Sequence, residues 1–283
     1  MKQTKNQKKK CRPFKKDGGK DDAVAAVVAL MLVLAVVVTC LAVYTTSYIP
    51  SLKQQAEISH ADEVLYTFKG FSAEMDSIYA TGELREYSNP IVLGAGDILL
   101  SPSKSSGTIE ITGNPIGSLK VGTGSGYTIN SIDVSYTPSF TVWEPQGIHY
   151  ENGVLWITKE DKKTPASLTD YTIESGLNQE EKIVKNRLGK IEKTMPETMD
   201  ENMVLTIITA ENKMNQSEIT GSGIADLHVE TKMENTDILL NNGDKLILTS
   251  WDGKTLKETT VSTESVNPLT LTLHRIIIEV SVQ

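Results

Sequence analysis

One uninterrupted apolar segment constrains this chain more than any other feature. No charged residue occurs from residue 23 to residue 52, and residues 23–44 read AVAAVVALMLVLAVVVTCLAVY. Because an α-helix rises 1.5 Å per residue, about 20 such residues cross the hydrocarbon of a bilayer. The segment therefore predicts one transmembrane helix, which we assign to residues 21–49. The alternative, a buried helix in a water-soluble domain, would lack a polar face to meet water.

The charges on either side of this segment predict its orientation. Nine of the 28 Lys and Arg residues lie in residues 1–20 beside a single acid, Asp17. The positive-inside rule makes residues 1–20 a basic cytoplasmic leader and residues 53–283 extracytoplasmic. We therefore expect a single-pass protein of the cell membrane, with the lipid bilayer as partner. The net charge of −8 conceals a strongly acidic body, which argues against nucleic-acid binding because phosphate contacts need basic surfaces.

Two kinds of cleaved signal compete with a retained helix. A secretory signal peptide has a shorter apolar run that ends at a small-x-small site, and Val38-Thr39-Cys40 offers no such site. A lipoprotein signal places a small residue before its Cys, whereas Thr39 precedes Cys40 and the apolar run continues beyond it. A retained helix behind a short charged leader fits best. A lipid-modified Cys40 stays as an alternative.

The junction between leader and helix resembles a known family. The segment Lys15-Lys16-Asp17-Gly18-Gly19-Lys20-Asp21-Asp22-Ala23-Val24 is similar to the N-terminus of archaeal type IV pilins and pilin-like surface proteins. The familiar archaeal form reads roughly Asp-Asp-Ala-Val-Ser-Pro-Val-Ile-Gly. This chain keeps the first four residues and lacks the Ser-Pro and the Gly. A second segment, His149-Tyr150-Glu151-Asn152-Gly153-Val154-Leu155, is similar to a turn of uncharacterised archaeal pilin-like ectodomains.

The resemblance implies processing and assembly. A prepilin peptidase would remove the leader on the cytoplasmic side, and the candidate processing region is Gly18, Gly19, Lys20, Asp21 and Asp22. The retained helix would then pack with other pilin-like subunits, in a structural or adhesive role in a type IV pilus-like surface filament. An acid at the new N-terminus would pair with a neighbour's terminal amine. The alternative is a monomeric single-pass anchored ectodomain, a surface-binding protein or lipoprotein that does not assemble.

Residues 51–82 predict an amphipathic stalk helix. Apolar or small side chains recur at steps of three and four, at Ile58, Ala61, Leu65, Phe68, Ser72, Met75 and Tyr79. Gly82 predicts the end of the helix, and Pro50 predicts a kink or break before it. The seam could pack on the protein's own β-rich domain or on neighbouring subunits, and pilins do both.

Beyond the stalk the pattern changes to short β segments punctuated by Gly, Pro, Asn and Ser. We assign a first β-rich region to residues 83–177, a polar connector to 178–202 and a second β-rich region to 203–283. With the long helix, these regions predict an α+β chain whose ectodomain is an antiparallel, β-sandwich-like structure. The expected strands are 91–93, 97–100, 108–112, 118–121, 127–136, 139–143, 153–159, 204–210, 224–230, 238–240, 245–251, 257–262 and 269–282.

Two turns and one strand stand out within this ectodomain. Asn152-Gly153 predicts a two-residue hairpin turn, because such turns need positive φ at both positions. The segment 241–244, Asn-Asn-Gly-Asp, predicts a second hairpin. The segment 269–280, LTLTLHRIIIEV, predicts a central buried strand.

Residue types that carry catalysis or bind metals are scattered. The four histidines have no metal-ligand spacing, and residues 122–126 lack the Lys-Ser/Thr of a phosphate-binding loop. Asp97, Asp133 and Glu151 could meet at a surface cation. We expect no enzyme, cofactor or metal site, and an anchored enzyme would need a polar cluster that the sequence lacks. Asn215 lies in the one Asn-x-Ser/Thr sequon and is a candidate glycosylation site.

Overall fold

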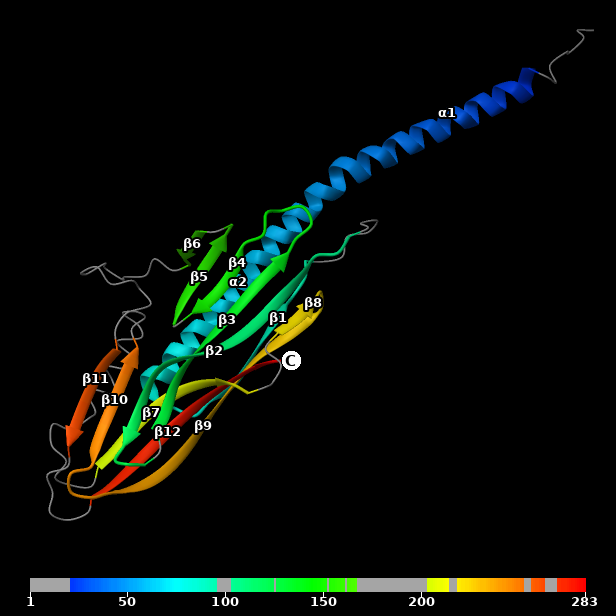
Figure 1. The fold of residues 1–283 in the computed structure, drawn as a ribbon. Helices are drawn as coiled ribbons and strands as arrows, with labels where there is room; N and C mark the ends of the chain where they lie inside the picture. The colour runs from blue at the N-terminus through cyan, green and yellow to red at the C-terminus, as the bar shows by residue number, and fades with distance from the viewer. Residues whose placement is uncertain are drawn as a thin grey trace, which may run out of the picture. The chain divides into compact units, whose positions relative to one another are not determined.

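The chain is organised as one long N-terminal helix followed by a β-rich region (Figure 1). The structure is a computed structural model that describes residues 21–95, 103–124, 126–151, 153–160, 162–166, 203–213, 218–251, 256–262 and 269–283. It divides into two compact units, Met1–Ser51 and Leu52–Gln283, which are described separately. The α+β class predicted from the sequence is confirmed at this level.

The first unit is dominated by α1 (Asp21–Val43). Every side chain of α1 from Val24 to Val43 is exposed, although nearly all are aliphatic. Within the part of the chain that the structure describes, one helix is long and apolar enough to cross a membrane. Exposed apolar surface on this scale marks a site that a bilayer or other chains must cover.

The helix continues through Pro50, which corrects the predicted break. The π-helical turn η1 (Tyr44–Tyr48) follows α1 directly, and α2 (Ile49–Thr81) follows η1. Proline lacks an N–H and its ring clashes with the carbonyl four residues earlier in an α-helix. The π turn is wider than an α-helical turn and is closed by the Ile49 N–H, which donates to the Tyr44 oxygen. It accommodates the missing N–H and the ring of Pro50 without ending the helix.

The buried face of α2 is offset from the predicted seam. Among the seven predicted positions, Phe68, Met75 and Tyr79 are buried, whereas Ile58 is 37% exposed. The observed buried residues are Ile49, Lys53, Glu57, His60, Val64, Phe68, Phe71, Met75, Ile78 and Tyr79. Their steps are again mostly three and four, as for one helix face. The helix ends as predicted, because Gly82 has φ of +68° and donates its N–H to the Ile78 oxygen at 2.8 Å.

The described strands of the second unit form two sheets (Figure 1). The strands are β1 (Glu86–Val92), β2 (Ser106–Val121), β3 (Gly126–Ser139), β4 (Gly147–Glu151), β5 (Val154–Lys159), β6 (Lys162–Pro165), β7 (Met203–Asn212), β8 (Glu218–Gly221), β9 (Ile224–Leu240), β10 (Lys245–Trp251), β11 (Leu256–Ser262) and β12 (Leu269–Val282). The four-stranded sheet has the order β1-β9-β12-β7. The eight-stranded sheet has the order β11-β10-β2-β3-β4-β5-β6, and β8 pairs with β2. Strands from both predicted β-rich regions therefore share each sheet.

The pairing confirms some predictions about single strands and corrects others. Strand β12 lies inside its sheet, antiparallel to β9 and parallel to β7, the one parallel pairing among the described strands. Strands β4 and β5 form the predicted hairpin, with Gly153 at φ of +89°; Asn152 lies outside the described residues. The predicted strand at 139–143 is absent, because β3 ends at Ser139. The segment 97–100 and the connector 178–202 lie outside the described residues.

The predicted hairpin at 241–244 is a turn between two sheets instead. The N–H of Asp244 bonds to the Asn241 oxygen, and Gly243 has φ of +86°, so the turn chemistry is as expected. However, Leu240 pairs with Leu269 in one sheet, whereas Lys245 pairs with Ser262 in the other. A local turn signal cannot tell whether the strands that it joins also pair.

Two hydrophobic cores form inside the second unit. The helix core joins α2 to both sheets; examples are Phe71, Tyr136, Tyr150, Val229 and Ile278. The strand core contains strand residues only: Ile116, Leu119, Val121, Ile129, Leu205, Ile207, Leu240, Leu246, Leu248, Val261, Leu269, Leu271 and Leu273.

The two cores occupy opposite faces of the same strands. Successive residues of a strand point to opposite faces, so odd and even positions separate. On β12, the odd residues Leu269, Leu271 and Leu273 lie in the strand core. The even residues Ile278, Val280 and Val282 lie in the helix core. One strand thus buries a different face at each of its ends.

Candidate functional site

The predicted processing region is only partly within the described residues. Asp21 and Asp22 are the first two residues of α1. Acidic residues at a helix N-terminus are favoured by the helix dipole. Gly18, Gly19 and Lys20 lie outside the described residues, as does the sequon residue Asn215.

The most unusual polar chemistry that the structure describes lies on the first turns of α2. Lys53, Glu57 and His60 are 7%, 1% and 5% exposed. They are spaced four and three residues apart, so they share the face of α2 that continues into the helix core. Buried ionisable residues are rare unless they are paired. We call these three residues the polar anchor.

Glu57 holds the loop between β3 and β4. Its carboxylate accepts the backbone N–H groups of Thr141 (2.7 Å), Val142 (3.1 Å) and Trp143 (2.7 Å). It also accepts the hydroxyls of Ser105 (2.7 Å) and Thr141 (2.9 Å). Burial by itself raises the pKa of this carboxyl, but the hydrogen bonds from Thr141, Ser105 and Trp143 outweigh burial and lower the pKa to about 2. The carboxylate therefore stays charged and saturated at neutral pH.

Lys53 ties a second segment to the same turns of α2. Its ammonium donates to the backbone oxygen of Ser103 at 2.5 Å and to the Ser103 hydroxyl at 2.8 Å. It also donates to the Thr141 hydroxyl at 3.1 Å. Since that hydroxyl donates in turn to Glu57, Thr141 links the two charged residues. Three donors of the ammonium thus have three neutral acceptors.

His60 completes the anchor through a buried tyrosine. The Tyr136 hydroxyl donates to the Leu93 oxygen at 2.9 Å, so it accepts from His60 Nε2 at 3.0 Å, which places the proton on Nε2. Burial lowers the pKa of His60 below its ordinary 6.5, so the ring is neutral at pH 7. Its ring meets that of Phe140 edge-on at 6.0 Å.

This arrangement positions chain segments and leaves little scope for other chemistry. The Lys53 ammonium, the Glu57 carboxylate and His60 Nε2 are all hydrogen-bonded to other parts of the protein. Elsewhere among the residues placed by the structure, no group of three His, Cys, Asp or Glu side chains could hold a metal ion. The acids considered for a cation have separate partners: Asn114 donates to Asp133, and Lys163 pairs with Glu151 at 2.6 Å. Asp97 lies outside the described residues.

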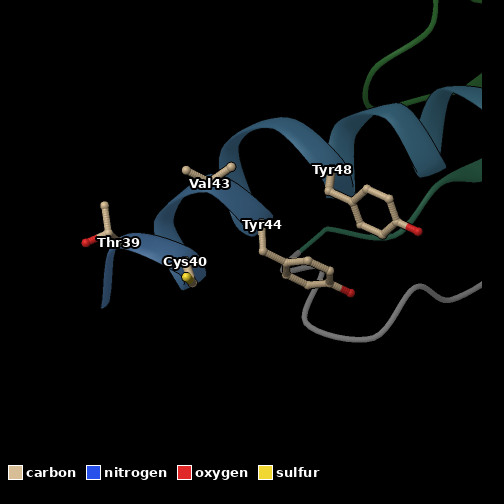
Figure 2. Close-up of a pocket in the computed structure, with 5 residues that line it drawn as sticks. All are labelled: Thr39, Cys40, Val43, Tyr44 and Tyr48. Carbon is tan, nitrogen blue, oxygen red and sulfur yellow. The ribbon is translucent and has the colours of Figure 1, made fainter. Parts of the chain in front are cut away.

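A second feature lies in the first unit, at the end of the apolar run. Thr39, Cys40, Val43, Tyr44 and Tyr48 line a shallow hollow along one side of the helix (Figure 2). The two tyrosine rings lie 5.3 Å apart. Tyrosine is typical of membrane–water interfaces, where its ring is buried and its hydroxyl stays wet. The sequence carried this signal, two tyrosines directly after the aliphatic run, but only the length of the run was used.

The polar anchor was missed for a different reason. A seam of apolar and small residues predicts only part of the buried face of α2, because Lys53, Glu57 and His60 at its start are polar. Their spacing of three and four residues continues through Val64 and Phe68, and this continuity was the available signal.

Comparisons of the chain with models of protein families, with curated proteins and with solved structures find no match.

Proposed function

We propose that this protein is a pilin-like cell-surface protein with a structural or adhesive role in a type IV pilus-like filament. The observation that carries the proposal is α1, a helix whose aliphatic side chains from Val24 to Val43 are all exposed. Such a surface needs a cover, which the bilayer supplies to a free subunit and neighbouring helices supply to an assembled one. The basic leader before it, with the Asp21-Asp22-Ala23-Val24 start, favours a pilin-like processing site over a plain anchor.

The proposal includes a topology. Residues 1–20 would lie in the cytoplasm, where a prepilin peptidase would cut between Gly18 and Asp22, and the second unit would lie outside the cell. The basic leader supports this orientation, and the tyrosine pair supports a membrane–water interface at the end of the apolar run.

We further propose that the ectodomain is a variant of the antiparallel β-sandwich. Two sheets contribute to both hydrophobic cores, which supports layered packing. The parallel pairing of β12 with β7 and the change of buried face along β12 set it apart from a simple two-layer sandwich.

One observation favours a second candidate, the monomeric anchored ectodomain. The apolar face of α2 is already covered, since Phe68, Phe71 and Met75 are fully buried against the β-rich part of the same unit. Assembly would therefore depend on α1 and on scattered exposed residues of α2 such as Tyr66, which is 80% exposed.

The experiment that separates the two candidates replaces both acids at the start of α1. The double variant Asp21→Ala, Asp22→Ala and the control Asp226→Ala, an exposed acid of β9, are expressed in place of the wild-type protein. The amounts in membranes and in sheared surface filaments are then measured. An assembling pilin loses filament incorporation in the double variant alone, with membrane levels retained. Equal recovery of the wild type, the double variant and the control in membranes, with none of them in the filament fraction, would support the monomeric anchor.

A further inference from the structure

We propose that residues 140–146, the loop between β3 and β4, dock on the lipid surface from which the helix emerges. The inference rests on the membrane anchoring in the proposed function and adds a second lipid contact, made by the ectodomain. We call residues 140–146 the interfacial loop.

The interfacial loop lies at the point where the chain enters the second unit. That unit begins at Leu52, and the loop is bonded to Lys53 and Glu57 in the first turns of α2 (Figure 1). Only four residues separate Lys53 from Tyr48, the second tyrosine after the apolar run. Within the ectodomain, the loop therefore belongs to the end that is tethered to the membrane helix.

The loop presents apolar and aromatic side chains. Val142 is 43% exposed, and the half-buried rings of Phe140 and Trp143 lie 5.9 Å apart beside it. Tryptophan is enriched at membrane interfaces, where its apolar ring and its N–H group meet different surroundings. A valine flanked by two aromatic rings has the composition of a shallow lipid-contacting tip.

Several polar groups of the loop already have partners inside the protein. A backbone N–H that enters the hydrocarbon of a bilayer without a hydrogen-bond partner is costly. Here the N–H groups of Thr141, Val142 and Trp143 all bond to the Glu57 carboxylate, so contact with lipid strips no water from them. The one charged side chain of the loop, Glu144, is paired with Lys159 at 2.7 Å. These groups can leave water for the lipid surface at low cost in free energy.

Single-cysteine labelling of the full chain in phosphatidylcholine nanodiscs tests the inference. The two native cysteines are Cys11 and Cys40. One protein keeps Cys40 and carries Cys11→Ser; two others lack both cysteines and carry Val142→Cys or Leu239→Cys. Leu239 is 64% exposed on β9 and serves as the matched control for an exposed apolar residue. Each cysteine carries a polarity-sensitive fluorophore, and lipids bearing a spin label near the headgroup or deep in the acyl chain act as quenchers.

The expected result is a blue-shifted emission at position 142 with loss of intensity from the shallow quencher, and an aqueous, unquenched spectrum at position 239. Cys40, one helical turn before Tyr44, loses emission to the lipid-borne quenchers and reports that the helix is inserted. A spectrum at position 142 that matches position 239, with Cys40 quenched, overturns the docking inference and leaves the membrane anchor standing. An unquenched Cys40 overturns the anchor itself, and the docking inference with it.

The variant Thr141→Val gives a second, independent readout. It removes the hydroxyl that donates to Glu57 and accepts from Lys53, and it leaves the backbone N–H donors of the loop in place. A docked loop keeps its quenching at position 142 in this background. Quenching that appears only in the Thr141→Val background, with none in the protein that keeps Thr141, would show that the contact needs a loosened loop and would contradict the inference.

Discussion

Replacing Glu57 with glutamine removes the charge that holds the loop between β3 and β4. The native carboxylate is 1% exposed and accepts three backbone N–H groups and two hydroxyls. Its pKa falls from an ordinary 4.5 to about 2 on folding. Since each unit corresponds to 1.36 kcal/mol, the charged form contributes about 3 kcal/mol to the free energy of unfolding at pH 7. We expect Glu57→Gln to lose stability of that order, because the amide also turns an N–H₂ toward N–H donors.

The dependence on pH is the sharper part of this prediction. A carboxyl whose pKa is depressed by folding contributes fully above its unfolded pKa, and the contribution disappears as pH falls through the folded pKa. The window therefore runs from pH 4.5 down to about 2. The difference between wild type and Glu57→Gln should shrink to about 1 kcal/mol at pH 3.

Urea unfolding of the full chain in detergent micelles, followed by tryptophan fluorescence at pH 7 and pH 3, measures both quantities. Glu63→Gln is the matched control, because Glu63 is an exposed acid on the same helix and should change stability by less than about 0.5 kcal/mol. A loss below about 1 kcal/mol at pH 7, or a loss of equal size at both pH values, would refute the reasoning about Glu57.

Three further predictions concern packing and protonation in the second unit. Gly107→Ala should lower the free energy of unfolding by about 1–3 kcal/mol, since its Cβ would lie 2.5 Å from a ring carbon of Tyr136; urea unfolding checks this, and an unchanged midpoint would contradict it. Met75→Ala should lower the free energy of unfolding by about 2–5 kcal/mol, because it opens a cavity at a fully buried site. Tyr66→Ala, at an 80% exposed site, is the control and should change the free energy of unfolding little. Burial lowers the pKa of His60 on folding, so the free energy of unfolding of the wild type should decline as pH falls from 6.5 through the lower folded pKa. His60→Gln should remove this decline. A decline of the same size in the variant would show that another group causes it.

Features set by local chemistry were predictable from the sequence. The length of the apolar run predicted the helix, and Gly82 predicted its end because a left-handed residue there favours glycine. The alternation on either side of Gly153 predicted the β4–β5 hairpin. The apolar residues from 269 to 280 predicted that β12 is buried and lies inside its sheet.

Features that depend on distant segments were not predictable in the same way. The effect of Pro50 depended on whether the helix would widen into a π turn, and composition alone does not decide that. The turn at 241–244 has ordinary turn residues, yet the strands that it joins enter different sheets. The hydrogen-bond donors to Glu57 lie 48 to 86 residues further along the chain, so the sequence around Glu57 does not indicate them.

The sequence of β12 also contains a signal for the change of its buried face. In residues 269–282, LTLTLHRIIIEVSV, the apolar positions are odd up to Leu273 and, apart from Ile277, even from Ile276 to Val282. This change of phase at His274-Arg275 indicates that the strand buries opposite faces at its two ends, as the two cores show. Phase changes of this kind could be sought in other long strands.

The mass of the N-terminus of the protein recovered from native membranes tests the central proposal most directly. Pilin-like processing predicts a mature chain that begins between Gly19 and Ala23 and retains the apolar helix. A chain that still carries its basic leader would contradict processing and leave a single-pass anchored ectodomain. A chain that begins at a lipid-modified Cys40 would contradict both and identify a lipoprotein.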